Sequence, residues 1–193
     1  MTKVRNYTTE ELLTRVKQLD SFDKLPKDYW ILGVQSKEDT YNEFDDKFYL
    51  FHNNIFVDIV TGTTNAGLTG LLHYDRYNNK GVAVIKTNEW YYNLWSYGLH
   101  HNKMPSLKQV NKIKYFRDWN KNVKIEEIGK IYEGKIGINF HTVTYQGKIS
   151  FIKKFIGGWS TGCQVINDVT KYYNLLNKVK YQDYVTYCLI KEF

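Results

Sequence analysis

The stretch from Asp45 to Gly62, DDKFYLFHNNIFVDIVTG, constrains the fold of this chain more than any other part of it. Apolar side chains alternate with polar ones on both sides of Asn53-Asn54, as they do in strands that are buried on one face. Asn tolerates the positive φ angles that a tight turn requires. The stretch therefore predicts two strands joined by a tight turn.

Short apolar runs elsewhere predict further strands, which are expected at residues 29–34, 81–86, 112–118, 137–141 and 184–190. Helical spacing is confined to the two ends of the chain. Thr8 and Glu11 form a capping-box pattern at the start of a predicted helix over 8–19. A second helix is predicted over 167–180, with Asn167 or Asp168 as its N-cap. This pattern favours a mainly β, α+β fold over a βαβ alternation.

The length of 193 residues fits a single domain, with residues 1–28 as a helical extension and residues 29–193 as the main body. The net charge of +7 is expected to attract polyanions such as nucleic acid, an anionic membrane or an acidic cell wall. No run approaches the ~20 apolar residues of a membrane-spanning helix, and no signal peptide is recognisable. We expect the protein to be made in the cytoplasm without a transmembrane segment.

One cysteine and one histidine, the residue types of a cysteine nucleophile and its base, occur together in residues 137–166, GINFHTVTYQGKISFIKKFIGGWSTGCQVI. His141 ends a predicted strand, and Cys163 lies between a Gly-rich turn and the second predicted helix. A thiol attacks as the thiolate, so it needs a nearby base or a positive environment. Two adjacent strand ends can bring the two residues together, and a helix N-terminus just after Cys163 would favour the thiolate.

Small residues beside Cys163 extend this candidate site. Gly162 lets the backbone approach closely, and the N–H groups of Gly162 and Cys163 can form an oxyanion hole. The residues that can orient the imidazole or wall the pocket are Ser160, Thr161, Thr142 and Trp159. On residue types alone, a buried structural thiol and a structural histidine remain the commoner interpretation.

Weaker candidates lie outside this segment. Arg117 can hold a substrate carboxylate through its planar guanidinium, and Asn139 shares a strand face with His141. His100 and His101 lie in a predicted polar turn, GLHHNK, where a surface or substrate-contact role is expected. Adjacent histidines on a strand point to opposite faces, so neither a metal site nor any cofactor is predicted.

The second cysteine, Cys188, lies in the apolar run YVTYCLI and is expected to be a buried structural thiol. A disulfide between Cys163 and Cys188 would remove the free thiol that a nucleophile needs, and the sequence leaves this pairing open.

Four motifs occur in a fixed order along the chain: Phe44-Asp45-Asp46, then TGTTNAG at 61–67, GINFH at 137–141 and WSTGCQV at 159–165. Together they resemble the L,D-transpeptidase catalytic-domain family, in the variant found in phages and prophages. The resemblance spans roughly residues 29 to 190. Its last motif is the most specific.

This resemblance implies a mixed β-sandwich or partial barrel, with Cys163 as the acyl-accepting nucleophile and His141 as its base. The implied substrate is a peptidoglycan stem peptide, attacked at an amide between an L-centre and a D-centre. The acyl-enzyme is then resolved by an amine or by water. Without a signal peptide, such a protein is expected to reach the wall through lysis, a holin or a virion.

Three positions depart from the wall-crosslinking enzymes. Thr161 replaces a His, and Gln164-Val165 replaces an apolar residue followed by Asn or Arg. Transpeptidation and hydrolysis both stay open, and Gln164 is a further candidate for substrate contact.

Two other functions remain as alternatives. The first is a non-catalytic wall-binding or virion structural module built on the same fold. The second is a nucleic-acid binder, a function that the positive charge and the abundant Tyr and Trp residues favour. Most of the aromatic residues lie within apolar runs, so core packing is their expected use and no nucleic-acid partner is predicted.

Overall fold

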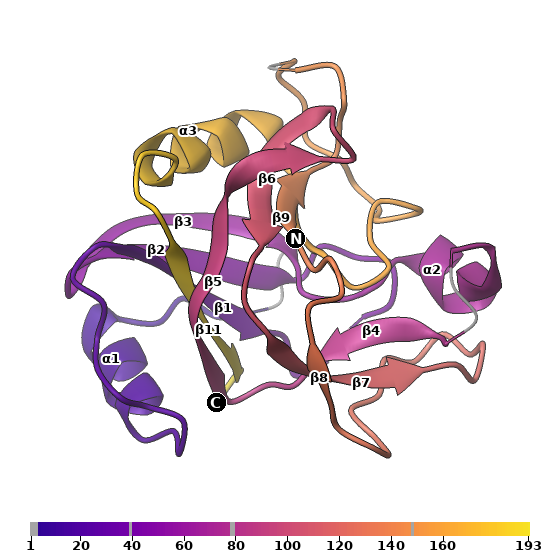
Figure 1. Cartoon of the computed structure of the whole chain (residues 1–193), viewed down its shortest axis with the longest axis horizontal. Coiled ribbons are helices and arrows are strands. Elements are labelled where there is room, and N and C mark those ends of the chain that lie inside the picture. The colour runs from indigo at the N-terminus through magenta and orange to yellow at the C-terminus, as the bar shows by residue number, and fades with distance from the viewer. Residues whose placement is uncertain (1–3, 39, 78–79, 148) are drawn as a thin grey trace.

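The computed structural model describes residues 4–38, 40–77, 80–147 and 149–193, and the fold is mainly β, in the α+β class (Figure 1). The larger sheet closes into a barrel in the order β1-β11-β5-β6-β9-β10-β3-β2. These strands are β1 (Tyr29–Gln35), β2 (Asp46–His52), β3 (Ile55–Thr63), β5 (Glu89–His100), β6 (Met104–Gln109), β9 (Phe140–Thr142), β10 (Gln164–Ile166) and β11 (Val185–Lys191). The sheet is mixed, since β1 with β11 and β9 with β10 are parallel pairs.

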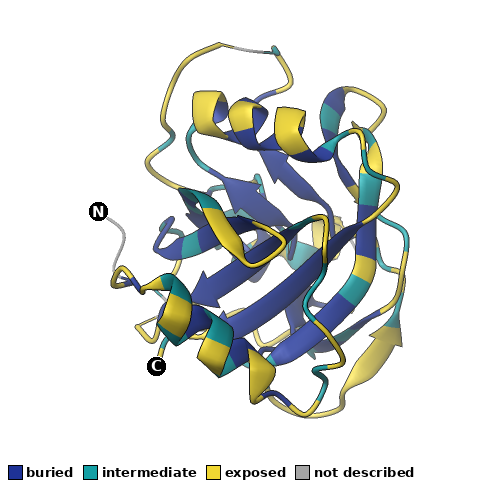
Figure 2. Cartoon of the chain, turned by 90° about the vertical axis from the view of Figure 1, so that its left-hand side faces the viewer, coloured by how far each residue is buried: buried dark blue, intermediate teal, exposed yellow. Residues whose placement is uncertain are grey.

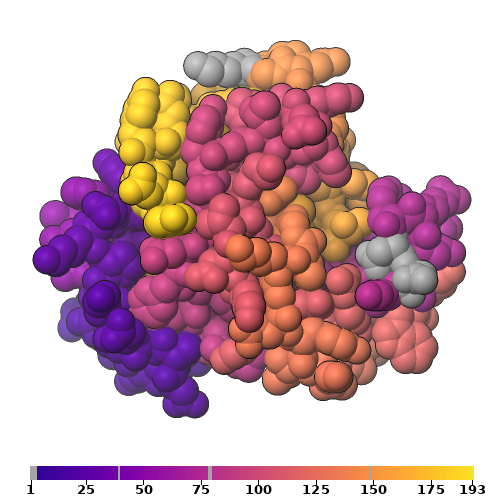
Figure 3. Space-filling model, in the orientation of Figure 1, coloured from indigo at the N-terminus to yellow at the C-terminus, as the bar shows by residue number. Residues whose placement is uncertain are grey.

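A smaller three-stranded sheet lies beside the barrel in the order β4-β7-β8. Its strands are β4 (Val82–Ile85), β7 (Ile113–Asp118) and β8 (Tyr132–Gly134). The helices are α1 (Thr9–Lys17), α2 (Leu68–His73), the 3-10 turn η1 (Tyr74–Arg76) and α3 (Val169–Val179). The N-terminal segment and the small sheet occupy opposite sides of the molecule (Figure 3).

The predicted hairpin is present as β2 and β3, and Asn53 in its turn has the positive φ that the sequence pattern requires, 57°. Its partner β1 is buried on both faces. Ile31 faces the barrel interior, whereas Trp30 and Leu32 face the layer under α1. The barrel interior and the surface beneath the N-terminal helix are therefore built by alternate residues of one strand.

Gly33 shows why a residue without a side chain is needed inside the barrel. A Cβ at this position would lie 2.3 Å from the Tyr187 hydroxyl oxygen. Tyr187 occupies that space, is fully buried, and donates a hydrogen bond to the Gln164 side-chain oxygen at 2.6 Å. The close approach of β1 thus lets a tyrosine from β11 reach the strand that follows Cys163.

Both predicted helices are present and amphipathic, with exposed residues on the outer face and buried ones against the sheet (Figure 2). The Thr8 hydroxyl oxygen accepts a hydrogen bond from the Glu11 N–H, and the Glu11 carboxylate accepts one from the Thr8 N–H, which completes the predicted capping box. Asp168 caps α3 by accepting from the Lys171 N–H.

The structure corrects several local predictions. The segment 61–70, whose Gly, Thr and Asn content is typical of a loop, contains the end of β3 and the start of α2. The sequence pattern missed β5, β6, β8 and β10, which are short or lack a clear alternation. The barrel is closed rather than partial. Residues 1–3 of the predicted N-terminal extension lie outside the described residues, and within the described ranges no helix is long and apolar enough to cross a bilayer.

Candidate active site

Cys163 is positioned by the parallel pair of strands β9 and β10. Gln164 lies opposite Phe140, and Val165 lies opposite His141. The Asn139 N–H donates to the Cys163 sulfur at 3.5 Å, and the thiol faces the Gly137 carbonyl at 3.6 Å. The prediction that two adjacent strand ends bring the cysteine and the histidine motif together is therefore confirmed.

The expected helix N-terminus beside the thiol is absent from this position. Strand β10 follows Cys163 directly, and α3 begins only at Val169. Because the helix-dipole effect falls off within one turn, α3 does not favour the thiolate. The prediction failed because the short apolar run after Cys163 pairs with β9 before the chain turns into the helix.

The loop before Cys163 is braced by the Ser160 hydroxyl. Ser160 Oγ accepts from the Gly162 N–H at 3.0 Å and donates to the Cys163 carbonyl at 2.9 Å. Gly162 has a φ of 133°, and a Cβ there would lie 2.6 Å from the Ala83 carbonyl oxygen. The Ser160 hydroxyl therefore braces this loop and does not orient the His141 imidazole as the sequence suggested. The Gly162 N–H is bound to Ser160 and is not open to a substrate.

Three of the sequence motifs are connected by a chain of buried hydrogen bonds. The Asp46 carboxylate accepts from the Thr64 N–H and from the Thr64 hydroxyl, at 2.6 and 2.8 Å. The Thr64 carbonyl accepts from the Gln164 side-chain amide at 3.1 Å. Gln164 is fully buried and does not line the pocket, so it has no surface for substrate contact. Its hydrogen bond instead braces the nucleophile loop, which we define as residues 159–163.

His141 is fully buried, and its Nδ1–H donates to the Thr142 carbonyl at 2.7 Å. A carbonyl only accepts, so the proton of the neutral ring is on Nδ1 and Nε2 carries the lone pair. Among the described residues, Nε2 has no hydrogen-bond partner. The main chain of Thr142 orients the imidazole, while the Thr142 hydroxyl donates to the Ile166 carbonyl and serves the strand pair.

His100 was expected in an exposed turn but is the last residue of β5 and only 7% exposed. Its ring stacks on His141 with centroids 4.1 Å apart and an interplanar angle of 19°. The Asn139 side-chain nitrogen lies 2.9 Å from His100 Nδ1. The exposed neighbour His101 adopts a positive φ of 49° in the turn, and its ring meets His100 edge-on.

Burial keeps the Cys163 thiol and the two imidazoles uncharged near neutral pH. It raises the pKa of the Cys163 thiol to about 11, a rise that the Asn139 N–H partly opposes. It lowers the pKa of His141 to about 4 and that of His100 to about 3. The resting site is a thiol beside an unprotonated imidazole, not a thiolate–imidazolium pair.

One nitrogen from each of His100 and His141 lies within 4.8 Å of the Cys163 sulfur and of the other nitrogen. These are ligand types that soft metals take. However, the lone pairs of imidazoles lie in the ring planes, and the two planes are nearly parallel and stacked. One ion cannot lie in both planes, so this arrangement does not fit a single bound metal.

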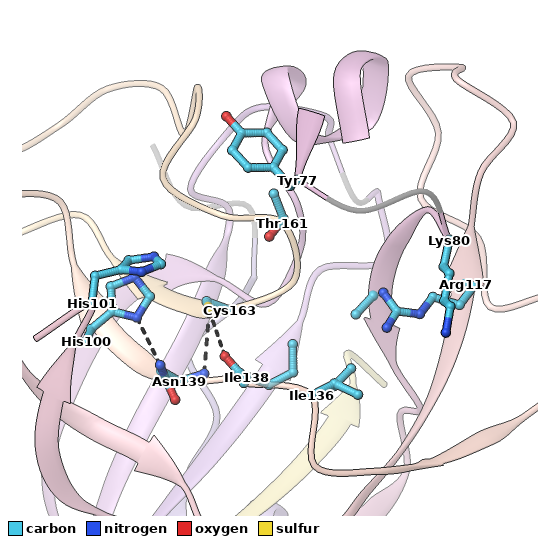
Figure 4. Close-up of a pocket in the computed structure, with 12 residues that line it drawn as sticks. Tyr77, Lys80, His100, His101, Arg117, Ile136, Ile138, Asn139, Thr161 and Cys163 are labelled. Carbon is cyan, nitrogen blue, oxygen red and sulfur yellow. Dashed lines mark hydrogen bonds between the residues drawn. The ribbon is translucent and has the colours of Figure 1, made fainter. Parts of the chain in front are cut away.

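An open pocket of about 590 Å³ leads to Cys163. The two histidines of the β5 turn lie on one side of Cys163, while Lys80 and Arg117 lie on the other (Figure 4). Arg117 is held by a hydrogen bond to the Gly81 carbonyl at 3.0 Å and by the Tyr115 ring beneath its guanidinium. Arg117 therefore lines the same pocket as Cys163, and its contact with a substrate carboxylate stays a prediction.

Trp159 is absent from this pocket wall. Its ring packs against Tyr145 with centroids 5.2 Å apart, and Tyr145 in turn stacks on His100 at 6.5 Å. Trp159 therefore supports a second aromatic face beside the histidines. Neither Tyr145 nor Lys80 had a sequence signal, because each lies in a polar segment whose path depends on the barrel.

Cys188 is fully buried in the separate layer under α1, and both cysteines are free. The structural role expected for Cys188 matches this position, and the open possibility of a Cys163–Cys188 disulfide is not realised.

Comparison of the chain with models of protein families, with curated proteins and with solved structures found no match.

Proposed function

We propose that the protein catalyses cysteine-dependent acyl transfer, with Cys163 as the nucleophile and His141 as its base. The observation that carries this proposal is the unpaired Nε2 of His141, a buried proton acceptor on a ring that has one nitrogen within 4.8 Å of the Cys163 sulfur, and that sulfur belongs to a residue lining an open pocket. A buried polar atom without a partner costs about 1–3 kcal/mol. Such a cost is characteristic of functional sites.

The reaction begins with a neutral pair. His141 Nε2 takes the thiol proton as the Cys163 sulfur bonds to the carbonyl carbon, so a free thiolate never accumulates. The tetrahedral intermediate collapses, and the amine leaves with the proton from His141 Nε2. The product is a thioester on Cys163. An amine or a water molecule then attacks the thioester carbonyl carbon and gives its proton to His141, the C–S bond breaks, and His141 returns the proton to the Cys163 sulfur as the acyl group is released.

The substrate class follows from the resemblance of the motifs and from the charge of the pocket. A peptidoglycan stem peptide carries free carboxylates close to its scissile amide. Lys80 and Arg117 line the pocket on the side away from the histidines, and a guanidinium binds a carboxylate through paired hydrogen bonds. The net charge of +7 favours approach to an anionic wall.

The test uses defined tetrapeptide and pentapeptide muropeptides, with and without an amine acceptor. Mass analysis should show cleaved or joined products with the native protein and none with Cys163→Ala. His141→Gln should reduce turnover by at least about a hundredfold, because general-base catalysis contributes 10²–10⁴-fold. Cys188→Ala should stay active. Turnover by Cys163→Ala would contradict the proposal.

A second candidate is a wall-binding module without catalysis. It is favoured by one observation: Cys163 is only 9% exposed, and burial raises the pKa of its thiol to about 11. Such a module would bind sacculi with equal affinity whether or not Cys163 is replaced by Ala, and it would release no peptide. Conversion of muropeptides that depends on Cys163 would exclude it.

A further inference from the structure

We propose that His100 is a second catalytic residue, which donates a hydrogen bond from Nε2 to the carbonyl oxygen of the group that Cys163 attacks. This inference rests on the proposed use of Cys163 as an acyl-accepting nucleophile. It adds the group that stabilises the oxyanion, and it assigns His100 and His141 opposite tasks.

The Asn139 side chain determines where His100 carries its proton. Asn139 Oδ1 accepts from the Gln109 N–H at 3.0 Å, which leaves its Nδ2 facing His100 Nδ1 at 2.9 Å. An amide nitrogen only donates, so Nδ1 of His100 is the acceptor. The proton of the neutral ring must therefore be on Nε2.

The position of His100 suits a donor to the reacting group. It lines the same pocket as Cys163, and one of its ring nitrogens is within 4.8 Å of the Cys163 sulfur. A carbonyl oxygen on a carbon bonded to that sulfur lies roughly 3 Å from the sulfur, and effective donors stand about 2.7–3.1 Å from the oxyanion. The His100 ring is therefore close enough to the sulfur for its Nε2–H, the one ring N–H that Asn139 leaves in place, to be the donor that this inference assigns.

The main chain alone supplies an incomplete oxyanion hole. Of the two N–H groups that the sequence pattern offers, that of Gly162 is bound by Ser160 Oγ at 3.0 Å. In this inference, the side-chain donor of His100 compensates for this loss.

His100 is suited to donate without losing or gaining a proton. Burial, followed by repulsion from His141, lowers the pKa of His100 to about 3. When His141 takes the thiol proton, its charge makes a second imidazolium beside it still less favourable. His100 therefore stays neutral, and its Nε2–H remains a hydrogen-bond donor throughout attack and collapse.

Two thiol reactions separate this role from a general effect on Cys163. p-Nitrophenyl acetate acylates a thiol through an oxyanion and expels p-nitrophenolate, whereas iodoacetamide alkylates it at a saturated carbon without one. Neither reagent requires peptidoglycan, so the comparison remains measurable even if no muropeptide is converted. Cys163→Ala sets the background for both reactions.

A matched pair of variants distinguishes a donor to substrate from a structural partner of Asn139. His100→Asn keeps a polar group near the position of Nδ1 and loses the Nε2 donor, whereas His100→Gln keeps a donor near Nε2. Acylation should fall by about 10²–10³-fold in His100→Asn and by less than about tenfold in His100→Gln. Alkylation should change by less than about threefold in both.

The exposed residue His52 provides the control, and His52→Gln should match the native protein in both reactions. Nitrogen NMR of the native protein gives a readout without any variant and should show His100 protonated on Nε2. An Nδ1-protonated His100, an unchanged ratio of acylation to alkylation in His100→Asn, or a greater loss in His100→Gln than in His100→Asn would overturn the inference.

Discussion

The imidazoles of His141 and His100 stack with their centroids 4.1 Å apart, and their neighbours place the protons on opposite nitrogens. Nδ1 of His141 donates to the Thr142 carbonyl, whereas Nδ1 of His100 accepts from the Asn139 amide. One ring thus offers an acceptor at Nε2 and the other a donor. Because both rings are buried and their charges would repel, the pair can carry at most one added proton near neutral pH.

The Cys163 thiol should alkylate slowly at neutral pH, with a rate that still rises toward pH 11. The reason is burial, which raises the pKa of this thiol to about 11 and keeps the thiolate scarce. Iodoacetamide rates, followed for each cysteine by peptide mass analysis, measure this directly. Cys188 should stay unlabelled while the protein is folded. A rate plateau below about pH 8 would instead reveal a thiolate–imidazolium pair.

Acid should destabilise the fold between about pH 6.5 and pH 4, partly through His141. The unfolded chain binds a proton to histidine near pH 6.5, whereas burial lowers the pKa of His141 in the folded state to about 4. The unfolded state therefore binds more protons in this window, and stability is lost as pH falls through it. For His141 the loss is roughly 3 kcal/mol.

Urea unfolding of the native protein and of His141→Gln across this window isolates the contribution of the one imidazole. The difference between the two curves should shrink as the pH falls, because the variant has no proton to gain at this position. His52→Gln, an exposed control, should keep the native profile. A constant difference at every pH would refute a neutral, buried His141.

The hydrogen bond between Tyr187 and Gln164 should couple the barrel interior to the nucleophile loop. Tyr187→Phe and Gln164→Leu should each lower the free energy of unfolding by about 1–3 kcal/mol, since each leaves a buried polar partner unpaired. The double variant should cost less than the sum, because the shared bond is lost once. Tyr184→Phe, at an exposed site, should cost under about 0.5 kcal/mol. Strict additivity would argue against the coupling.

Arg117 should recognise a substrate carboxylate. Arg117→Met should raise KM by about tenfold for a stem peptide with a free carboxylate, since a charge-assisted hydrogen bond contributes about 1.5–3 kcal/mol. For the same peptide with that carboxylate amidated, Arg117→Met should change KM little. Arg76→Met, an exposed arginine outside the pocket, serves as the control. Equal effects on both peptides would mean that Arg117 acts through the fold.

Periodicity along the chain predicted those elements whose formation depends on neighbours in sequence. The capping box at Thr8 and Glu11, the hairpin around Asn53 and the helix after Asp168 are all local devices. The pattern failed at β6, whose pairing with β5 and β9 depends on segments elsewhere in the chain. It also failed after Cys163, where pairing with β9 prevails over the start of a helix.

The sequence by itself determined that this chain is mainly β, and it predicted that adjacent strand ends bring Cys163 and His141 together. Local periodicity is sufficient for the first, whereas a catalytic use of the two residues is implied by the resemblance of the motifs. Only the tertiary structure decided the tasks of the surrounding residues. Closure of the barrel buries the thiol and both imidazoles, which removes water and makes the uncharged forms the stable ones. Closure also turns the Gln164 side chain inward, where it braces the nucleophile loop. It brings His100 from the end of β5 onto the face of His141. These two residues are 41 positions apart, so no local sequence pattern predicts their contact.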